Sequence, residues 1–174
     1  MPDQTGLELV AQRVREAVGD EAVVGTHHAY DRGSLEVAPA RVHDVLTHLR
    51  DADEEPYGVL ASLHGCDYLP SEPRLGVHYE LLSMQSRERL NVKTRVTVED
   101  PHVPTVTDLF PTADFHEREV YDFFGVAFDG HPDLTRVLMP DDWDGHPHRK
   151  DYPLGGVEVD FKGATIPPPD ERSY

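Results

Sequence analysis

Apolar residues recur with helical spacing in two stretches of the N-terminal half. Residues 5–18 place an apolar side chain at every third or fourth position, and residues 40–51 repeat this pattern. Gly19 follows the first stretch and marks its end. The inward positions of the two predicted helices are Leu7, Val10, Ala11, Val14, Val18, Val42, Val45, Leu46 and Leu49.

Alternation of apolar and polar residues predicts strands in the same half. The clearest run is 90–98, which reads as an antiparallel strand with one face toward water. Residues 57–69 hold the apolar run VLASL, which predicts a central strand. The predicted strands cover residues 21–29, 35–38, 57–69, 77–82 and 90–98. Together with the helices they give an α+β order that ends near Asp100.

A third helix is predicted at residues 114–124, after prolines that end the sheet region. Asp114, Arg118 and Asp122 are spaced four residues apart and predict a charge ladder on its exposed side. Gly125 ends the helix. Beyond it the periodicity fades, and prolines recur every six to eight residues up to Pro153, so only short elements fit.

The pattern as a whole predicts an α+β fold: an N-terminal mixed sheet with helices on one face, followed by an extended, Pro-rich C-terminal arm with a short helix. Residues 1–112 would form the α+β domain, and residues 113–174 the arm and tail. The last ten residues, TIPPPDERSY, resemble polyproline and are expected to be ordered only against another surface.

Charge and composition exclude several classes of function. The formal net charge of −17 argues against nucleic-acid binding and against direct docking on an anionic membrane. The single cysteine, Cys66, indicates a reducing compartment and cannot hold an iron–sulfur cluster, which takes about four thiolates. No apolar run approaches the roughly 20 residues of a spanning helix. No signal peptide is visible, so we expect a cytoplasmic protein.

Histidines and acids between residues 116 and 151 suggest a metal hypothesis that their spacing does not support. HEREV begins like the zinc motif HExxH, but Val120 stands where the second His is needed. DDWDG resembles a calcium loop, but Pro140 falls at the first ligand position. His131, His146 and His148 could approach one another, although a His next to Pro more often hydrogen-bonds the backbone. Zinc at these histidines stays a minor alternative.

Acid–base and nucleophilic chemistry have equally weak sequence support. Glu117, Glu119 and Asp122 could act as paired carboxylates, but Arg118 among them on an exposed helix face favours mutual ion pairing. The serine elbow, the dinucleotide glycine motif and the P-loop are all absent from the sequence. We therefore predict no catalytic, cofactor-binding or metal-binding residue in this chain.

Large apolar and charged residues gather in the segment after the third helix. Aromatic and Arg anchors on an irregular, Pro-stiffened segment are typical of an interface that wraps a partner. Packing of the segment against its own sheet is the alternative, and composition leaves both open. The apolar anchors are Phe123, Phe124, Phe128, Leu134, Val137, Leu138, Met139, Trp143 and Tyr152.

Five blocks of this segment resemble the signature of the C-subunit family of NADH–quinone oxidoreductase, the respiratory complex I. Their order and spacing over about forty residues make the match specific, whereas residues 1–112 agree with the family only in length and pattern. Phe115, Thr135 and His148 depart from the residues that the family usually has. The blocks are Glu117-Arg118-Glu119, Asp122-Phe123-Phe124-Gly125, Gly130-His131-Pro132-Asp133-Leu134, Asp142-Trp143-Asp144-Gly145-His146-Pro147 and Arg149-Lys150-Asp151-Tyr152-Pro153.

The resemblance implies a non-catalytic structural subunit of the peripheral arm of that enzyme. The enzyme transfers electrons from NADH through iron–sulfur clusters to quinone and couples this to proton translocation. The clusters, FMN and quinone would lie in partner subunits, with no cofactor in this chain. Residues 113–174 would dock on complex I subunits D, B and I, chiefly on the first, which forms the quinone site. The chain would sit peripherally on the cytoplasmic face of a bacterial plasma membrane, through the complex alone.

The resemblance also names the residues expected at the interface, and two alternatives remain beside it. One is the equivalent subunit of a related membrane-bound hydrogenase or formate-hydrogen lyase, and the other is a free-standing metal-dependent hydrolase. The expected interface residues are Glu117, Arg118, Glu119, Asp122, Gly125, His131, Pro132, Asp133, Leu134, Arg136, Trp143, Gly145, His146, Pro147, Arg149, Lys150, Asp151, Tyr152 and Pro153.

Overall fold

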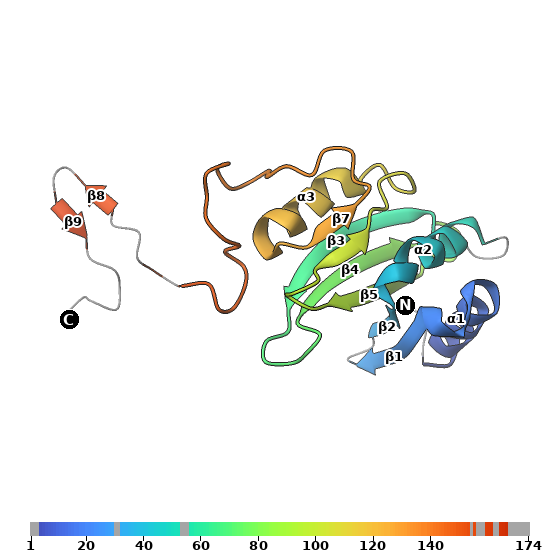
Figure 1. Ribbon diagram of the computed structural model, residues 1–174. Helices are drawn as coiled ribbons and strands as arrows, with labels where there is room; N and C mark the ends of the chain where they lie inside the picture. The colour runs from blue at the N-terminus through green and yellow to red at the C-terminus, as the bar shows by residue number, and fades with distance from the viewer. Residues whose placement is uncertain are drawn as a thin grey trace.

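A five-stranded mixed sheet forms the centre of the protein (Figure 1). The computed structural model describes residues 4–29, 32–52, 56–153, 155, 159–161 and 164–166. The strands are β1 (Val23–Ala29), β2 (Arg32–Val37), β3 (Val59–Asp67), β4 (Leu75–Leu82) and β5 (Arg89–Val96), in the spatial order β1-β2-β5-β4-β3. The β2–β5 pair is parallel, and the other neighbours are antiparallel. The predicted mixed sheet is confirmed.

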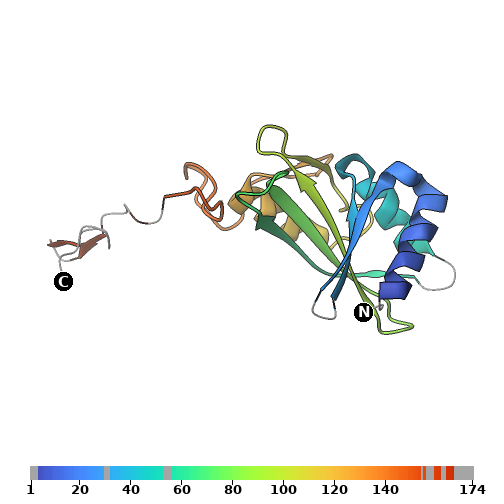
Figure 2. The same cartoon turned by 90° about the horizontal axis from the view of Figure 1, so that it is seen from below.

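All three helices pack on one face of this sheet (Figures 1 and 2), which was predicted for the first two, whereas the third was expected in an extended arm. Buried side chains of the sheet form rows across that face, for example Leu63, Tyr79, Val92 and Leu35, which are neighbours in register. The helices α1 and α2 supply the other side of the core, and α3 packs along β3. The helices are α1 (Gln4–Val18), α2 (Val42–Asp51) and α3 (Ala113–Phe124), and the 3-10 turns are η1 (Asp20–Ala22) and η2 (Pro39–Arg41).

The strand β3 occupies an edge of the sheet, so the prediction that residues 57–69 form a central strand was wrong. Leu60 and Leu63 are buried on either side of an irregularity in the pairing with β4. Leu60 and Leu63 are apolar because they face the helices in the core, although β3 has a neighbouring strand on one side only. The middle position belongs to β5, which alternates as predicted.

Two short sheets complete the described secondary structure. The strands β6 (His102–Pro104) and β7 (Ala127–Asp129) pair in parallel and flank α3 at both ends. The strands β8 (Val159–Phe161) and β9 (Ala164–Ile166) form an antiparallel pair. Residues 131–152 contain turns and bends between these elements. Within the described residues, no helix combines the length and the apolar character that a membrane crossing requires.

Candidate functional site

A buried carboxylate on α3 holds the loop that follows the helix. Asp122 is fully buried, and its Oδ2 accepts hydrogen bonds from the backbone N–H groups of Val137, Leu138 and Met139 at 3.1, 2.8 and 2.8 Å. Its Oδ1 accepts from Arg136 Nη1 at 2.6 Å. Burial opposes ionisation, but these donors outweigh it and lower the pKa of Asp122. Asp122 thus acts as a fixed anion around which the loop folds.

Arg136 extends this hold along the loop. Its side chain is 15% exposed, and Nη2 donates to the backbone oxygens of Trp143 and Gly145, each at 3.0 Å. Nη1 also reaches the backbone oxygen of Asp122 at 3.3 Å. One guanidinium therefore joins the end of α3 to two later points of the chain, and its planar set of donors suits this role.

A second buried carboxylate lies earlier on α3. The Oε1 of Glu117 accepts from the backbone N–H of Val106 at 2.8 Å, and Oε2 accepts from the Thr105 hydroxyl at 2.5 Å. Burial raises the pKa of Glu117 to about 7; these hydrogen bonds oppose the rise, and the negative charges of Asp114 and Asp108 add to it. Glu117 ties α3 to the chain that leads into it from β6.

The predicted charge ladder of Asp114, Arg118 and Asp122 on an exposed side of α3 was wrong, because Asp122 is buried. Glu117, Glu119 and Asp122 were also expected on an exposed face, but only Glu119 is exposed. Arg118 bonds the next loop instead, donating to Thr135 O at 3.1 Å and Thr135 Oγ1 at 2.9 Å. The reason is that α3 lies between the sheet and the loop, so polar side chains on two of its sides meet main-chain donors and acceptors of this chain.

Charged residues of β3 and of the turn before β4 fasten the far end of the loop. The guanidinium of Arg74 donates to both oxygens of Asp67, at 2.9 and 2.6 Å, and to both oxygens of Asp151, at 2.8 and 2.6 Å. The backbone N–H of Lys150 also bonds Asp67 Oδ2 at 2.7 Å. The Arg74 hydrogen bonds hold the pKa of Asp67 far below its usual value. Sequence reasoning missed Asp67 and Arg74, which no motif marks.

The end of α3 requires a glycine because two side chains of the loop come very close to it. Gly125 has φ +73°, and a Cβ there would lie 2.4 Å from His146 Nε2 and 2.6 Å from Arg149 Nη2. His146 Nδ1 hydrogen-bonds the backbone oxygen of Asp122 at 3.0 Å. Arg149 Nε donates to Phe124 O at 2.7 Å, and burial lowers the pKa of this guanidinium.

The three histidines considered as metal ligands make other contacts. His131 Nε2 bonds the backbone oxygen of Asp114 at 3.2 Å, and its Nδ1 accepts from the N–H of Asp133 at 3.0 Å. His148 stacks on Phe123 with ring centroids 3.9 Å apart. In the described part of the chain, no group of three or more His, Cys, Asp and Glu is arranged to hold a metal ion. The prediction that His beside Pro bonds backbone is confirmed for His131 and for His146.

The three departures from the family pattern each have a partner within the chain. Arg118 lies over the Phe115 ring, 5.4 Å from its centroid, and also bonds Thr135, while His148 stacks on Phe123.

The remaining residues expected at the interface differ in exposure. Tyr152 donates to the backbone oxygen of Asp144 at 3.1 Å, and its ring lies close to Gly145, which has φ +81°. Pro132, Asp133 and Pro153 are exposed, and Leu134 and Pro147 are half-buried.

Large apolar groups remain on the outer side of this framework. Phe115 on α3 is 62% exposed and Leu138 in the loop is 59% exposed. Internal contacts hold both residues in place: the Arg118 guanidinium lies over the Phe115 ring, and the backbone N–H of Leu138 donates to Asp122. We call the exposed parts of Phe115, Leu138 and the loop between residues 134 and 143 the outer loop surface. It is preorganised, because its backbone is held by buried side chains.

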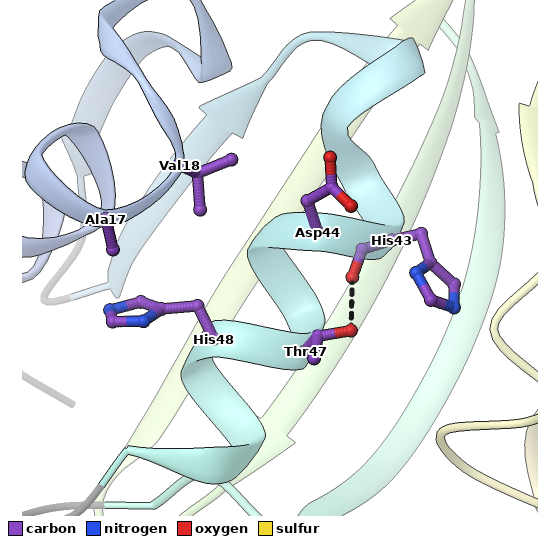
Figure 3. A pocket seen from close by; sticks show the side chains of 6 residues that line it. All are labelled: Ala17, Val18, His43, Asp44, Thr47 and His48. Atoms are coloured by element: carbon purple, nitrogen blue, oxygen red, sulfur yellow. Dashed lines mark hydrogen bonds between the residues drawn. The ribbon is translucent and has the colours of Figure 1, made fainter.

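A hollow of the surface lies elsewhere, between α1 and α2 (Figure 3). It has a volume of about 470 Å³ and is lined by Ala17, Val18, His43, Asp44, Thr47 and His48. Figure 3 shows His43 on the side of α2 away from Val18, and its Nε2 bonds the Asp108 carboxylate at 2.9 Å. His43 therefore does not point into this hollow, and we assign the hollow no ligand.

A family model described as the 30 kDa subunit of respiratory-chain NADH dehydrogenase matches residues 35–158. The chain is 54% identical over 145 residues to the C subunit of NADH-quinone oxidoreductase from Salinispora arenicola, which covers 82% of this chain and 59% of the relative. It is 44% identical over 169 residues to the protein of the same name from Mycolicibacterium gilvum, covering 94% and 74%. The chain thus spans less than two thirds of several relatives, with 58 to 59% for the first three.

Two solved structures share the fold. A trypsin-resistant fragment of Nqo5 superposes with a TM-score of 0.61 at 34% identity, over 72% of this chain and 99% of the fragment. A chain in the structure of the membrane-bound sulfane sulfur reductase, an archaeal respiratory membrane complex, superposes with a TM-score of 0.67 at 26% identity, over 84% and 85%. Both similarities extend across most of the chain described above.

Proposed function

The chain belongs to the family of the 30 kDa subunit of respiratory-chain NADH dehydrogenase, and on this basis we propose that it is a non-catalytic structural subunit of the peripheral arm of NADH–quinone oxidoreductase. The observation that carries the proposal is that residues of the family signature bond the protein's own backbone. Asp122, Arg136 and Arg149 bind main-chain groups of their own loop and of α3. Such residues shape a surface, whereas a reaction would need polar groups directed at a substrate.

The outer loop surface is the proposed contact with the rest of the enzyme. Phe115 and Leu138 are large apolar side chains exposed on a backbone that is already fixed, and such anchors bind with little ordering cost. Among complex I subunits D, B and I, we assign their contact to the first, with the other two nearby, because the resemblance of the signature implies these partners. Residues 113–174 then act as the docking unit and residues 1–112 as the supporting domain.

Electron carriers are proposed to lie in the partner subunits. One cysteine cannot supply the roughly four thiolates of an iron–sulfur cluster, and Cys66 is half-buried on β3. FMN and quinone are assigned to partners in the same way. The chain would then reach the cytoplasmic face of the membrane only through the complex, which the acidic surface of this chain also favours.

A second candidate is the equivalent subunit of another respiratory membrane complex. The similarity to a chain of the archaeal sulfane sulfur reductase structure, at 26% identity, supports a module used by more than one such assembly. Hydrogenases and formate-hydrogen lyases of the membrane-bound type belong to this candidate. The NADH-linked assembly is favoured because the family model and the relatives above 40% identity carry that description.

Recovery of the tagged chain from its own membranes, with partners identified by mass, tests the proposal. We expect a cluster-bearing, NADH-oxidising and quinone-reducing assembly in stoichiometric amounts. Leu138→Asp should lower its recovery at least about tenfold, equivalent to about 1.4 kcal/mol, since a charge would enter an apolar contact. Leu9→Asp is the matched control, because Leu9 is also exposed, at 53%, but lies on α1.

Two results would contradict this function, and a third would contradict only the proposed contact. Recovery of the chain alone with bound zinc would reopen the histidines as a site. Recovery of an assembly that oxidises hydrogen or formate without NADH would favour the second candidate. Equal recovery with Leu138→Asp and Leu9→Asp would remove the outer loop surface from the contact.

A further inference from the structure

The face of the sheet opposite the helices carries a line of cations along its middle strand. In β5 the side chains of Leu90, Val92 and Thr94 point into the core, so residues 89, 91, 93 and 95 point to the open face. Three of these four are Arg89, Lys93 and Arg95. We call the outward residues of β1 to β5 the open sheet face.

The charge balance of the open sheet face is opposite to that of the whole chain. The chain has 16 Lys and Arg against 33 Asp and Glu. By register, the charged residues of the open sheet face within the five strands are Arg32, Glu36, Glu80, Arg89, Lys93 and Arg95, which are four cations against two acids. A sheet face exposed to water needs polar residues, but this exposure does not require cations to outnumber acids.

Both acids of this face are already engaged. The carboxylate of Glu36 lies 3.0 Å from Lys93 Nζ and 2.8 Å from His27 Nε2. Glu80 accepts from Asn91 Nδ2 at 2.8 Å. The positive charge that remains is held by the arginines, of which Arg89 is exposed.

Three histidine side chains line a hollow beside these cations. A hollow of about 310 Å³ is lined by His27, Ala29, Arg32, Gly33, Ser34, His64, His78, Glu80 and Asn91. His64 and His78 stack with centroids 5.0 Å apart, and Tyr68 bonds His78 at 2.7 Å. Arg95 lies over the Tyr68 ring, 4.4 Å from its centroid. The lining of this hollow is thus fixed by internal contacts, and it offers ring faces and hydrogen-bond donors to a partner.

The length of the cation line decides the kind of partner. Arg89 and Arg95 are six positions apart, which is about 20 Å along a strand at about 3.3 Å per residue. A single small anion could not span this line, whereas several carboxylates of an extended polypeptide could. A long nucleic acid would extend beyond this face and be repelled by the acidic rest of the chain, because charges interact over a screening length of about 8 Å.

We propose that the open sheet face binds an acidic segment of a second partner chain, on the opposite side of the sheet from α3. This inference goes beyond the proposed docking of the outer loop surface and requires only that the chain works in an assembly. The subunit would then join two partners, one through the outer loop surface and one through the open sheet face.

Site-specific photo-crosslinking in the native assembly tests the inference. A benzoylphenylalanine is placed at His64, which is exposed on the open sheet face, at Leu138 as the reference for the proposed docking surface, and at Leu9 on α1 as the control. We expect His64 to capture a peptide rich in Asp and Glu from a chain other than the one that Leu138 captures. Leu9 should not capture that peptide.

Charge variants in the His64-labelled chain then test the chemistry. Arg89→Glu combined with Arg95→Gln should lower the His64 crosslink about fivefold or more, because like charge would face the acidic segment. Arg13→Glu on α1 should change it less than about twofold. Thermal unfolding of each variant checks that the fold is kept, and Arg89→Glu alone serves if loss of the Arg95 contact with Tyr68 unfolds the pair.

Several results would overturn the inference. A crosslink at Leu138 with none at His64 would leave the open sheet face to solvent and keep the proposed function. Capture of a segment without acidic character, of a nuclease-sensitive species, or of a peptide unaffected by Arg89→Glu would refute the acidic partner. The absence of a crosslink at both His64 and Leu138 would contradict the proposal that the chain works in an assembly.

Discussion

Replacing Asp122 with Asn tests whether one buried anion organises residues 131–152. The side chain keeps its shape but loses its charge. In the native protein one oxygen serves three backbone N–H groups and the other serves Arg136. The single oxygen of Asn can serve only one of these sides, so an N–H of the amide must face a donor on the other.

The cost follows from the burial of both partners. Asp122 is fully buried and Arg136 is 15% exposed, so the guanidinium would stay in the protein without its anion. Breaking a buried ion pair on one side typically costs about 3–5 kcal/mol. Total stabilities of domains are about 5–15 kcal/mol, so we expect the loop to detach well before the sheet unfolds.

Urea unfolding followed by two signals measures this directly. Trp143 is the only tryptophan, and its backbone oxygen is bound by Arg136, so its fluorescence reports on the loop. Far-ultraviolet circular dichroism reports on the sheet and helices. We expect one coincident transition in the wild-type protein, and in Asp122→Asn a fluorescence transition that comes at lower urea than the dichroism.

Two further variants make the measurement decisive. Glu119→Gln removes an acid from an exposed position of the same helix and should change stability by less than about 0.5 kcal/mol. Removing both partners in Asp122→Asn with Arg136→Met should cost less than the sum of the single changes, because the stranded cation is gone. A loss below about 1 kcal/mol in Asp122→Asn, with both signals still coincident, would refute the reasoning.

Three other changes probe the same framework. The folded pKa of Glu117, about 7, exceeds its ordinary value of 4.5, so its contribution to stability is complete below pH 4.5 and is lost as pH rises through 7. Glu117→Gln should remove this loss, up to about 3 kcal/mol, from urea midpoints measured between about pH 5 and 8, and an unchanged profile would contradict the assignment. Gly125→Ala should lower the free energy of unfolding by at least about 1–3 kcal/mol, and with it the melting point, whereas Gly58→Ala, where a Cβ meets nothing within 4 Å, should have little effect. Equal melting points of the two variants would count against the close approach at Gly125. Arg74→Met should cost about 3–5 kcal/mol because it strands the buried carboxylate of Asp67, and calorimetry finding less than about 1 kcal/mol would exclude that role.

The sheet and the helices were predictable because their signals are local. Each depends on side chains two, three or four residues apart, and β5 and α2 appear where the spacing puts them. The place of a strand in the order of the sheet is not set by local signals. The VLASL run looks central because it is apolar, but α3 covers β3 from one face, and its contribution lies more than forty residues later in the chain.

The roles of the acidic residues of α3 were not predictable for a related reason. Spacing correctly gave the helix, but Glu117 and Asp122 bind backbone N–H groups, which every residue except proline possesses. Nothing in the sequence marks which amides they meet. The resemblance to a family named these residues as interface residues, and it did not indicate that several of them support a loop from within.

The parallel pairing of β2 with β5 has a consequence for how the chain folds. Ser34 and Asn91 are neighbours in the sheet but lie 57 positions apart in the chain, whereas β3, β4 and β5 follow one another as a meander. Closing the longer loop has the larger entropic cost, so the meander should form first and the β1–β2 hairpin should join it last. During synthesis the N-terminal hairpin must then wait for β5 to leave the ribosome. Pulsed hydrogen exchange should find the amides of β4 protected before those of β2, and the reverse order would show that the hairpin nucleates folding.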